Sequence, residues 1–208
     1  MNRIVIAEIT NAENNWPHSL KNEHRIENNN WNYASDVRVG FNIGYDSGNI
    51  YLKFFVEESN TKAVYRAFNE PVYEDSCVEF FISLDGENYY NLEFNCIGNI
   101  LGGYGSERNN REVIPASVLQ QIVTKPSLGS NRIEIIDRKT DWTLGVKIPI
   151  SVFIHDKIEK LNGVQASCNF YKCGDKQVFP HYLSWNPITA RKPDFHLPQF
   201  FGEIIFNN

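Results

Sequence analysis

The stretch CVEFFISLDGENYYNLEFNC, residues 77–96, decides the fold class of this protein. In residues 77–84 and again in residues 89–96, every second side chain is apolar, which is the period of a β-strand with one buried face. Asp85-Gly86, between the two runs, is a turn signal typical of a β-hairpin. The stretch therefore predicts two antiparallel strands joined by a short turn.

The register of this hairpin follows from the requirement that facing residues point to the same side of the sheet. Placing Leu84 opposite Tyr90 pairs two apolar side chains and sets Glu79 opposite Asn95. One face of the hairpin is then an apolar wall. The opposite face carries the polar side chains, namely Glu79, Ser83, Asn91, Glu93 and Asn95.

The same alternation recurs along the rest of the chain. It is seen at residues 50–57, 142–148, 164–171 and 204–206, whereas helical signal is confined to short turns near 115–123 and 151–154. Alternation of this kind is typical of antiparallel sheets packed face to face. The sequence predicts an all-β protein, an antiparallel β-sandwich of immunoglobulin or jelly-roll kind with a few short helices, forming a single domain over residues 1–208.

Composition narrows the function classes. The 208 residues carry a net charge of −5, which argues against a nucleic-acid partner because phosphate neutralisation needs a basic surface. No stretch approaches the roughly 20 apolar residues of a membrane span. The apolar run after Met1 ends at Glu8 and is too short for a signal peptide. We expect a monomer, cytoplasmic if Met1 is native and secreted or periplasmic if a leader was removed.

The four cysteines lack the spacing of a zinc motif. Cys77, Cys96, Cys168 and Cys173 form no C-x-x-C pair and have no matching histidine spacing. We interpret them as buried thiols, with a disulfide as the alternative.

The polar face of the hairpin has three interpretations. It suits sugar hydroxyls, because carboxylates accept hydrogen bonds and amides both donate and accept them. It is equally compatible with a solvated strand face in a structural or interaction domain. A third interpretation is a glycoside hydrolase that uses Glu79 and Glu93, since two carboxyl groups on one face are what that reaction requires.

Several segments carry a family resemblance. The segment EPVYEDSCVEFFI, residues 70–82, resembles carbohydrate-binding module family 9, and so do residues 89–96. The resemblance continues through Trp142 to Pro149, NFYKCGD at 169–175, HYLSWNP at 181–187, and residues 193–196 and 200–203. The resemblance covers essentially the whole chain. Within the family, the sequence is similar to the family-9-like domains of gut and environmental Bacteroidetes.

The resemblance implies a non-catalytic sandwich that grips a sugar between two aromatic rings, often at the end of a glucan or xylan chain. Trp185 matches one ring, and Tyr73 stands where the other ring is often Trp. A shallow clamp of two rings predicts micromolar-to-millimolar affinity, because ring contacts contribute on the order of 1 kcal/mol beyond area burial.

The resemblance also implies the polar contacts. Glu79 matches the acidic residue that hydrogen-bonds sugar hydroxyls, and Asn95 matches a polar position on the next strand. Arg108 or Arg111 matches the basic group of family sites. Family members can bind structural calcium, but no ligand motif for calcium is evident here. The leading hypothesis is therefore carbohydrate binding without catalysis, with a glycosidase and an interaction domain as alternatives.

Overall fold

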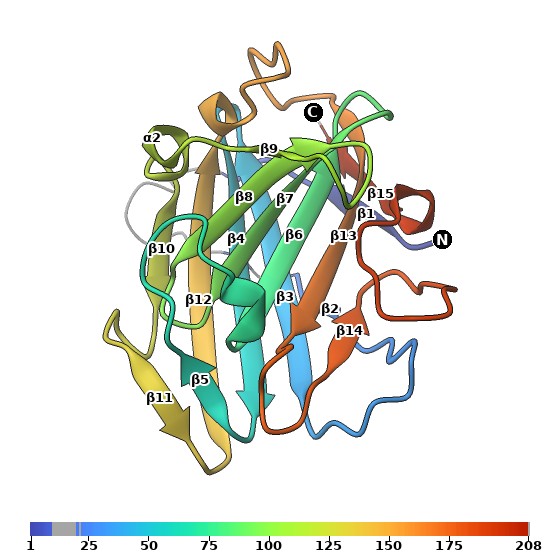
Figure 1. Cartoon of the computed structure of the whole chain (residues 1–208). Helices are drawn as coiled ribbons and strands as arrows, with labels where there is room; N and C mark the ends of the chain where they lie inside the picture. Colours follow the sequence, from blue (N-terminus) through green and yellow to red (C-terminus); the bar gives the residue numbers. More distant parts are fainter. Residues whose placement is uncertain (10–19, 21, 208) are drawn as a thin grey trace.

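The computed structural model describes residues 1–9, 20 and 22–207, and two β-sheets packed face to face dominate it (Figure 1). Over these residues the larger sheet has eight strands in the order β1-β15-β13-β6-β7-β8-β9, with β14 added beside β13. Its strands are β1 (Arg3–Ile6), β6 (Cys77–Ser83), β7 (Tyr89–Asn95), β8 (Ile100–Gly105), β9 (Glu112–Val113), β13 (Gln165–Cys173), β14 (Tyr182–Ser184) and β15 (Gly202–Phe206).

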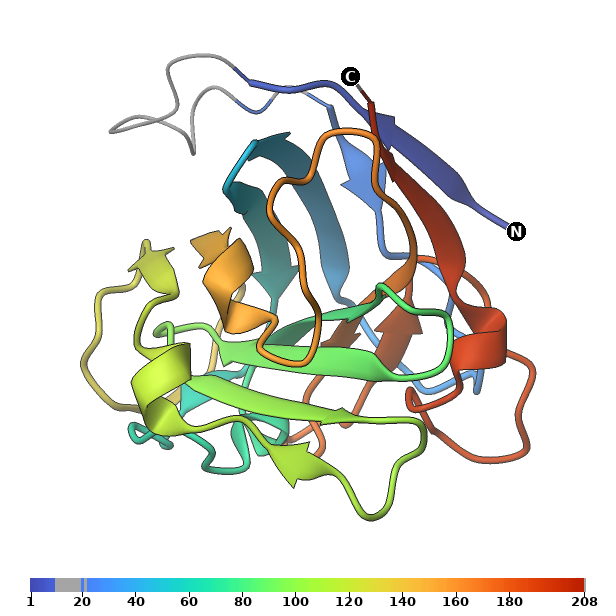
Figure 2. The same cartoon turned by 90° about the horizontal axis from the view of Figure 1, so that it is seen from above.

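The smaller sheet lies behind it as a second layer (Figure 2). Over the described residues it has five strands, in the order β10 (Val123–Pro126), β12 (Thr140–Pro149), β4 (Asn49–Glu58), β3 (Arg38–Asp46) and β2 (His24–Arg25). A separate two-stranded sheet pairs β5 (Thr61–Ala63) with β11 (Ile133–Ile136). The pairs within these sheets are antiparallel except β1–β15, which is parallel. The predicted β-sandwich is confirmed.

Helical structure in the described chain is limited to single turns. They are α2 (Ala116–Leu119) and the 3-10 turns η1 (Val72–Glu74), η2 (Ile150–Val152) and η3 (Pro198–Phe200). None of the helices within the described ranges is long and apolar enough to cross a bilayer.

The core between the sheets is built from the alternating apolar side chains. Phe170 of β13 stacks on Phe80 of β6, with ring centroids 4.9 Å apart, and on Phe41 of β3, with centroids 3.8 Å apart. These three rings therefore connect the two layers through the middle of the sandwich. All four cysteines are buried free thiols, as the sequence predicts.

The predicted hairpin register is wrong by two residues. Tyr90 pairs with Ile82 rather than Leu84, and Glu79 pairs with Glu93 rather than Asn95. The turn is wider than Asp85-Gly86 alone, because the Asp85 carboxylate accepts hydrogen bonds from the backbone N–H groups of residues 87 and 88. A shift by an even number of residues preserves the faces. The apolar wall and the polar face are thus those expected, but the polar residues face different partners.

The outer face of the larger sheet carries a second apolar cluster. It is made by side chains of β6, β7 and β13 together with the loops around η1 and η3, namely Val72, Cys77, Phe81, Tyr89, Tyr171, Cys173, Ile188, Phe195 and Phe201. As a result β6 and β7 are buried on both faces along their whole length. These loops build up a rim around the polar side chains of the hairpin.

A polar cluster lies inside the sandwich. Lys172 Nζ contacts Glu58 Oε2 at 2.8 Å and His181 Nε2 at 2.7 Å, and both charged side chains are fully buried. Trp142 donates its indole N–H to Glu58 Oε1 at 2.8 Å. Burial and then the Lys172 charge lower the pKa of His181 to about 4.

This pKa predicts an acid-sensitive contribution to stability. Because the folded-state pKa of His181 is below its ordinary value of 6.5, the contribution is complete above pH 6.5 and is lost as the pH falls towards 4. Between about pH 7 and about pH 4.5, we expect wild type to lose about 2 kcal/mol more of its unfolding free energy than His181→Gln does.

Urea unfolding of both proteins at the two pH values measures this difference. The charged groups that act on His181 are Lys172, Glu58 and Asp36, and all three are present in both proteins. Equal losses in the two proteins would show that His181 does not carry the effect.

Candidate functional site

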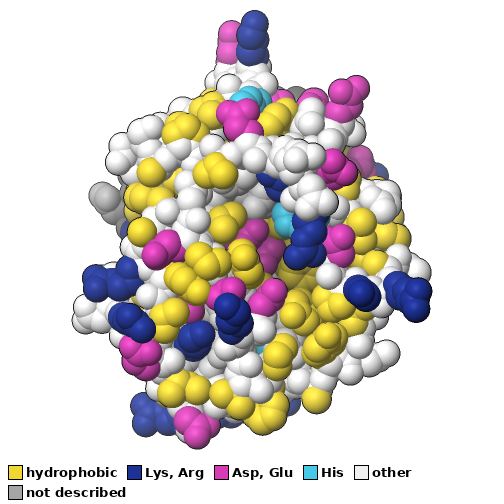
Figure 3. Space-filling model, viewed as in Figure 1, with side chains coloured by type: hydrophobic (Ala, Val, Ile, Leu, Met, Phe, Trp, Pro, Cys, Tyr) yellow, Lys and Arg dark blue, Asp and Glu magenta, His cyan; other side chains and the backbone are white. Residues whose placement is uncertain are grey.

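A cavity of about 520 Å³ opens on the outer face of the larger sheet. Figure 3 shows acidic side chains gathered at the centre of this face, with basic side chains beside them. The lining comes from segments far apart in the sequence, namely Tyr33, Tyr73, Glu79, Asn91, Glu93, Leu101, Arg108, Arg111, Cys173, Asp175, Tyr182, Lys192, Pro193, Asp194, Phe195 and His196. A volume of this size is typical of pockets for small molecules.

The floor of the cavity is formed by two facing carboxyl groups. Glu79 of β6 and Glu93 of β7 are directly opposite each other in the sheet, and both are buried. Glu79 Oε1 accepts a hydrogen bond from the Cys173 thiol at 2.9 Å, and Glu93 Oε1 accepts one from the Asn91 amide at 2.9 Å. Glu93 Oε2 is buried and has no hydrogen-bond partner among the described residues. The floor therefore offers an unused acceptor.

The same burial perturbs the acids of the cavity. Burial, and then the neighbouring charge of Glu93, raises the pKa of Glu79 well above its ordinary value. Burial raises the pKa of Glu93 to about 7 and that of Asp175 to about 6. Three carboxyl groups therefore lie close together in one desolvated site, where their negative charges are unfavourable. The site favours groups that neutralise or hydrogen-bond these carboxyls, namely protons, cations or hydroxyl donors.

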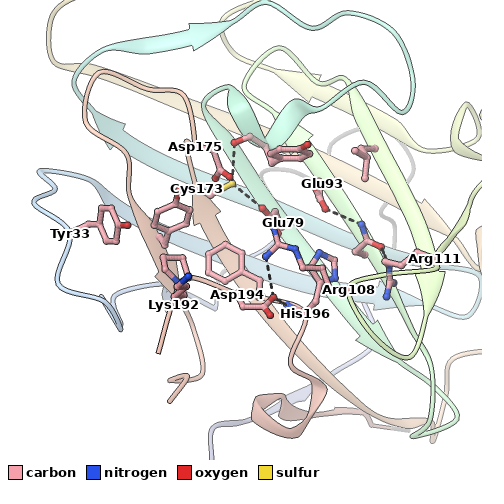
Figure 4. A pocket seen from close by; sticks show the side chains of 16 residues that line it. Tyr33, Glu79, Glu93, Arg108, Arg111, Cys173, Asp175, Lys192, Asp194 and His196 are labelled. Carbon is pink, nitrogen blue, oxygen red and sulfur yellow. Dashed lines mark hydrogen bonds and ion pairs between the residues drawn. The ribbon is translucent and has the colours of Figure 1, made fainter. Parts of the chain in front are cut away.

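Aromatic rings form the walls. Tyr73 lies on η1 with 37% of its surface exposed. Tyr182 of β14 contacts Tyr33 edge to face, with ring centroids 5.0 Å apart. In Figure 4 Tyr33 lies at the opposite end of the cavity from Arg111. The cavity thus combines a polar floor with aromatic sides.

The turn that carries Tyr73 is held by a buried carboxylate. Asp75 accepts hydrogen bonds from the backbone N–H groups of Val64 and Tyr65, each within 3.1 Å. Asn95 donates its amide to Asp75 at 3.0 Å and to the Tyr65 carbonyl at 2.9 Å. Asn95 therefore supports the turn from beneath; it does not line the cavity, contrary to the role expected from the resemblance.

The two arginines have different surroundings. Arg108 Nη1 lies 3.5 Å from Asp194 Oδ1, and its side chain is largely exposed. Arg111 donates to Asn91 Oδ1 and to the Tyr89 carbonyl, both at 2.8 Å, and lies over the Tyr89 ring. Arg108 is consequently available to a ligand, whereas Arg111 orients Asn91 beneath it.

Trp185 is placed in the core, away from Tyr73. Its ring packs edge to face against Phe41 and Phe170, and only 5% of its surface is exposed. Its backbone N–H donates to the Phe170 carbonyl, which turns the ring inwards. The exposed edge borders a separate cavity near Asn2 and Arg25. The expected clamp of Tyr73 and Trp185 is therefore not formed.

Other lining residues escaped the sequence-based prediction. Asp175 and Tyr182 lie inside the motifs that carried the resemblance, so those motifs were the available signal. Asp194 likewise lies in the resembling segment 193–196, whereas Tyr33 and Lys192 lie in loops without a distinctive pattern.

A cluster of metal-ligating side chains lies in the described part of the chain, but its donors do not suit calcium. One group of at least three His, Cys, Asp or Glu side chains brings its donor atoms together there, and it consists of Cys77, Glu79 and Cys173. Two of these donors are sulfur, whereas calcium takes oxygen ligands. The calcium implied by the resemblance does not fit this group.

Comparisons with known proteins agree with the fold. A crystal structure from Bacteroides uniformis, of a protein proposed to bind carbohydrate, is 32% identical, covers 99% of both chains and superposes with a TM-score of 0.92. Two structures of a family 9 module from Caldicellulosiruptor kristjanssonii, in complex with glucose and with cellotriose, are each 15% identical. They cover 99% of this chain and 96% and 94% of theirs, with TM-scores of 0.58 and 0.60.

No curated protein matches the sequence. The profile described as "Carbohydrate-binding family 9", in contrast, matches residues 17–206, which is nearly the entire chain. The chain belongs to carbohydrate-binding family 9.

Proposed function

We propose that this protein binds carbohydrate without catalysing a reaction, and that the sugar occupies the cavity between Tyr73 and Tyr182. The observation that carries the proposal is the combination of exposed tyrosine rings with buried carboxyl groups in one cavity. Rings pack against the C–H faces of a pyranose, and carboxyl oxygens accept hydrogen bonds from its hydroxyls. Family membership and the carbohydrate complexes of the related modules support the same function.

The polar groups suggest how a sugar is oriented. Glu93 Oε2 is an acceptor without a partner on the floor, and Arg108 is a donor at the rim. A hydroxyl group that donates to Glu93 and accepts from Arg108 would satisfy both. Because the cavity is compact, we propose a short oligosaccharide or the end of a polysaccharide chain as the ligand.

Replacing Tyr73 tests the aromatic contact. We expect Tyr73→Ala to lower the affinity for the best-bound sugar about fivefold, because loss of a ring contact is worth on the order of 1 kcal/mol. Isothermal titration calorimetry against gluco-, xylo- and manno-oligosaccharides measures this. Phe68→Ala is the matched control, because Phe68 is similarly exposed but does not line the cavity.

Two outcomes would contradict the proposal. One is the absence of binding to any member of the panel at millimolar concentration, and the other is an unchanged affinity in Tyr73→Ala.

Hydrolysis is the second candidate, favoured by the direct opposition of Glu79 and Glu93. Paired carboxyl groups are the catalytic groups of glycosidases. Release of reducing sugar by wild type and its loss in both Glu79→Gln and Glu93→Gln would establish this activity. We expect no release from wild type.

A further inference from the structure

Strand pairing brings two cysteines together beneath the cavity. In the register of β6 with β13, Cys77 faces Cys173 directly, although the two are far apart in the sequence. Glu79 follows Cys77 by two residues and therefore points to the same face of the sheet. All three side chains are buried.

Their donor atoms form one compact group. The Cys77 sulfur, the Cys173 sulfur and a Glu79 carboxyl oxygen all lie within 4.8 Å of one another. The Cys173 sulfur is 2.9 Å from Glu79 Oε1. Glu79 and Cys173 also line the cavity, so the group is reached from solvent on that side (Figure 4).

A second observation indicates that the group lacks a cationic partner. Glu93, which faces Glu79 across the sheet, has a buried carboxyl oxygen without a hydrogen bond among the described residues. No Lys or Arg of the described chain forms an ion pair with Glu79 or Glu93. Arg108, which also lines the cavity, pairs with Asp194 instead. Lys172 contacts Glu58 between the two sheets, and Arg111 is used by Asn91 and backbone carbonyls.

The donor set selects the kind of cation. Two thiolates and one carboxylate suit zinc, which is commonly tetrahedral with Zn–S distances of about 2.3 Å, whereas magnesium and calcium take oxygen ligands. Three protein ligands leave a fourth position for another ligand, and two of the three, Glu79 and Cys173, line the cavity.

We propose that Cys77, Cys173 and Glu79 bind a zinc ion at the floor of the cavity, with the fourth coordination position directed towards Glu93 and the cavity. Binding displaces water from the hydrated zinc ion and releases to solvent the two thiol protons and any proton held by the Glu79 carboxyl. It forms two zinc–sulfur bonds and one zinc–oxygen bond without any change in oxidation state. The site does not depend on whether the cavity binds sugar.

Metal titration of the reduced protein tests this proposal. The full chain is kept reduced with a phosphine, freed of metal by dialysis against a chelator, and titrated with Co²⁺ and then with Zn²⁺. We expect one equivalent of Co²⁺ to give sulfur-to-metal charge-transfer absorption and tetrahedral ligand-field bands, and one equivalent of Zn²⁺ to remove both. Sugar is absent, so this result is independent of the proposed function.

Cysteine variants locate the site. Cys77→Ser and Cys173→Ser are each expected to lose the charge-transfer band and at least about a hundredfold in zinc affinity, since even the loss of a residue that only hydrogen-bonds to a metal ligand costs about 10–100-fold. Cys168→Ser is the matched control, because Cys168 is also fully buried on β13 but faces the core between the sheets. Circular dichroism identifies any variant that does not fold, and Cys77→Ala and Cys173→Ala then replace it.

Three results would overturn the proposal. They are no uptake of Zn²⁺ by the reduced wild type, unchanged uptake in both Cys77→Ser and Cys173→Ser, and loss of uptake in Cys168→Ser to the same extent.

Discussion

Glu58→Gln is expected to lower the free energy of unfolding by about 3–5 kcal/mol, because removal of one partner from a buried ion pair leaves the other charge uncompensated. Glu58 and Lys172 are fully buried and 2.8 Å apart. Glutamine can still accept the hydrogen bond of the Trp142 indole, so the substitution isolates the loss of charge. Urea unfolding at neutral pH measures the change.

Glu57→Gln is the matched control on the same strand. Glu57 forms ion pairs with Arg38 and Lys139, whose side chains are exposed, so we expect a change of less than about 1 kcal/mol. A double variant, Glu58→Leu with Lys172→Met, is expected to be more stable than Glu58→Gln because it leaves no buried charge. If Glu58→Gln cost no more than Glu57→Gln, the buried pair would have no special role in stability.

Trp185→Ala is expected to destabilise the protein by about 3–5 kcal/mol, because it removes a large ring from the core and leaves a cavity. The ring contacts Phe41 and Phe170 and lies so close to Gly202 that a Cβ placed there would be 2.4 Å from it. Since the ring does not line the cavity of Tyr73, we expect sugar affinity to be unchanged in the folded variant.

Tyr73→Ala is expected to show the opposite balance of effects on affinity and stability. Tyr73 is partly exposed, so its replacement should affect affinity much more than stability. Chemical unfolding and calorimetry on both variants give the two quantities separately. A loss of affinity in folded Trp185→Ala equal to that in Tyr73→Ala would place the tryptophan in the ligand site after all.

The β-strands show where local pattern suffices. The hairpin of β6 and β7 is predicted with the correct faces, and only its register differs, because the hydrogen bonds of Asp85 widen the turn. Strand β3 was not among the predicted strands, although Val39 and Phe41 follow the alternation. Its other face includes Gly40 and Gly44, which weaken the strand signal. At Gly40 the backbone of the neighbouring strand β2 approaches so closely that a Cβ would lie 2.9 Å from the His24 carbonyl, which explains the glycine there.

The candidate site was only partly predictable. Tyr73, Glu79, Arg108 and Arg111 line the cavity as a group, whereas Trp185 and Asn95 do not. Motif position places a residue on an element, but the direction of a side chain on an irregular segment depends on backbone contacts with other segments. For Trp185 the decisive contact is the backbone hydrogen bond to Phe170.

The sequence by itself determined the sandwich and the two faces of the stretch 77–96, because strand periodicity is a local property of neighbouring residues. Tertiary structure alone decided that Tyr33 and Tyr182 approach Tyr73 around one cavity, and that Cys77 faces Cys173. These juxtapositions arise from pairing between strands distant in the chain and from loops packed on the outer face of the sheet. No pattern within a single segment encodes them.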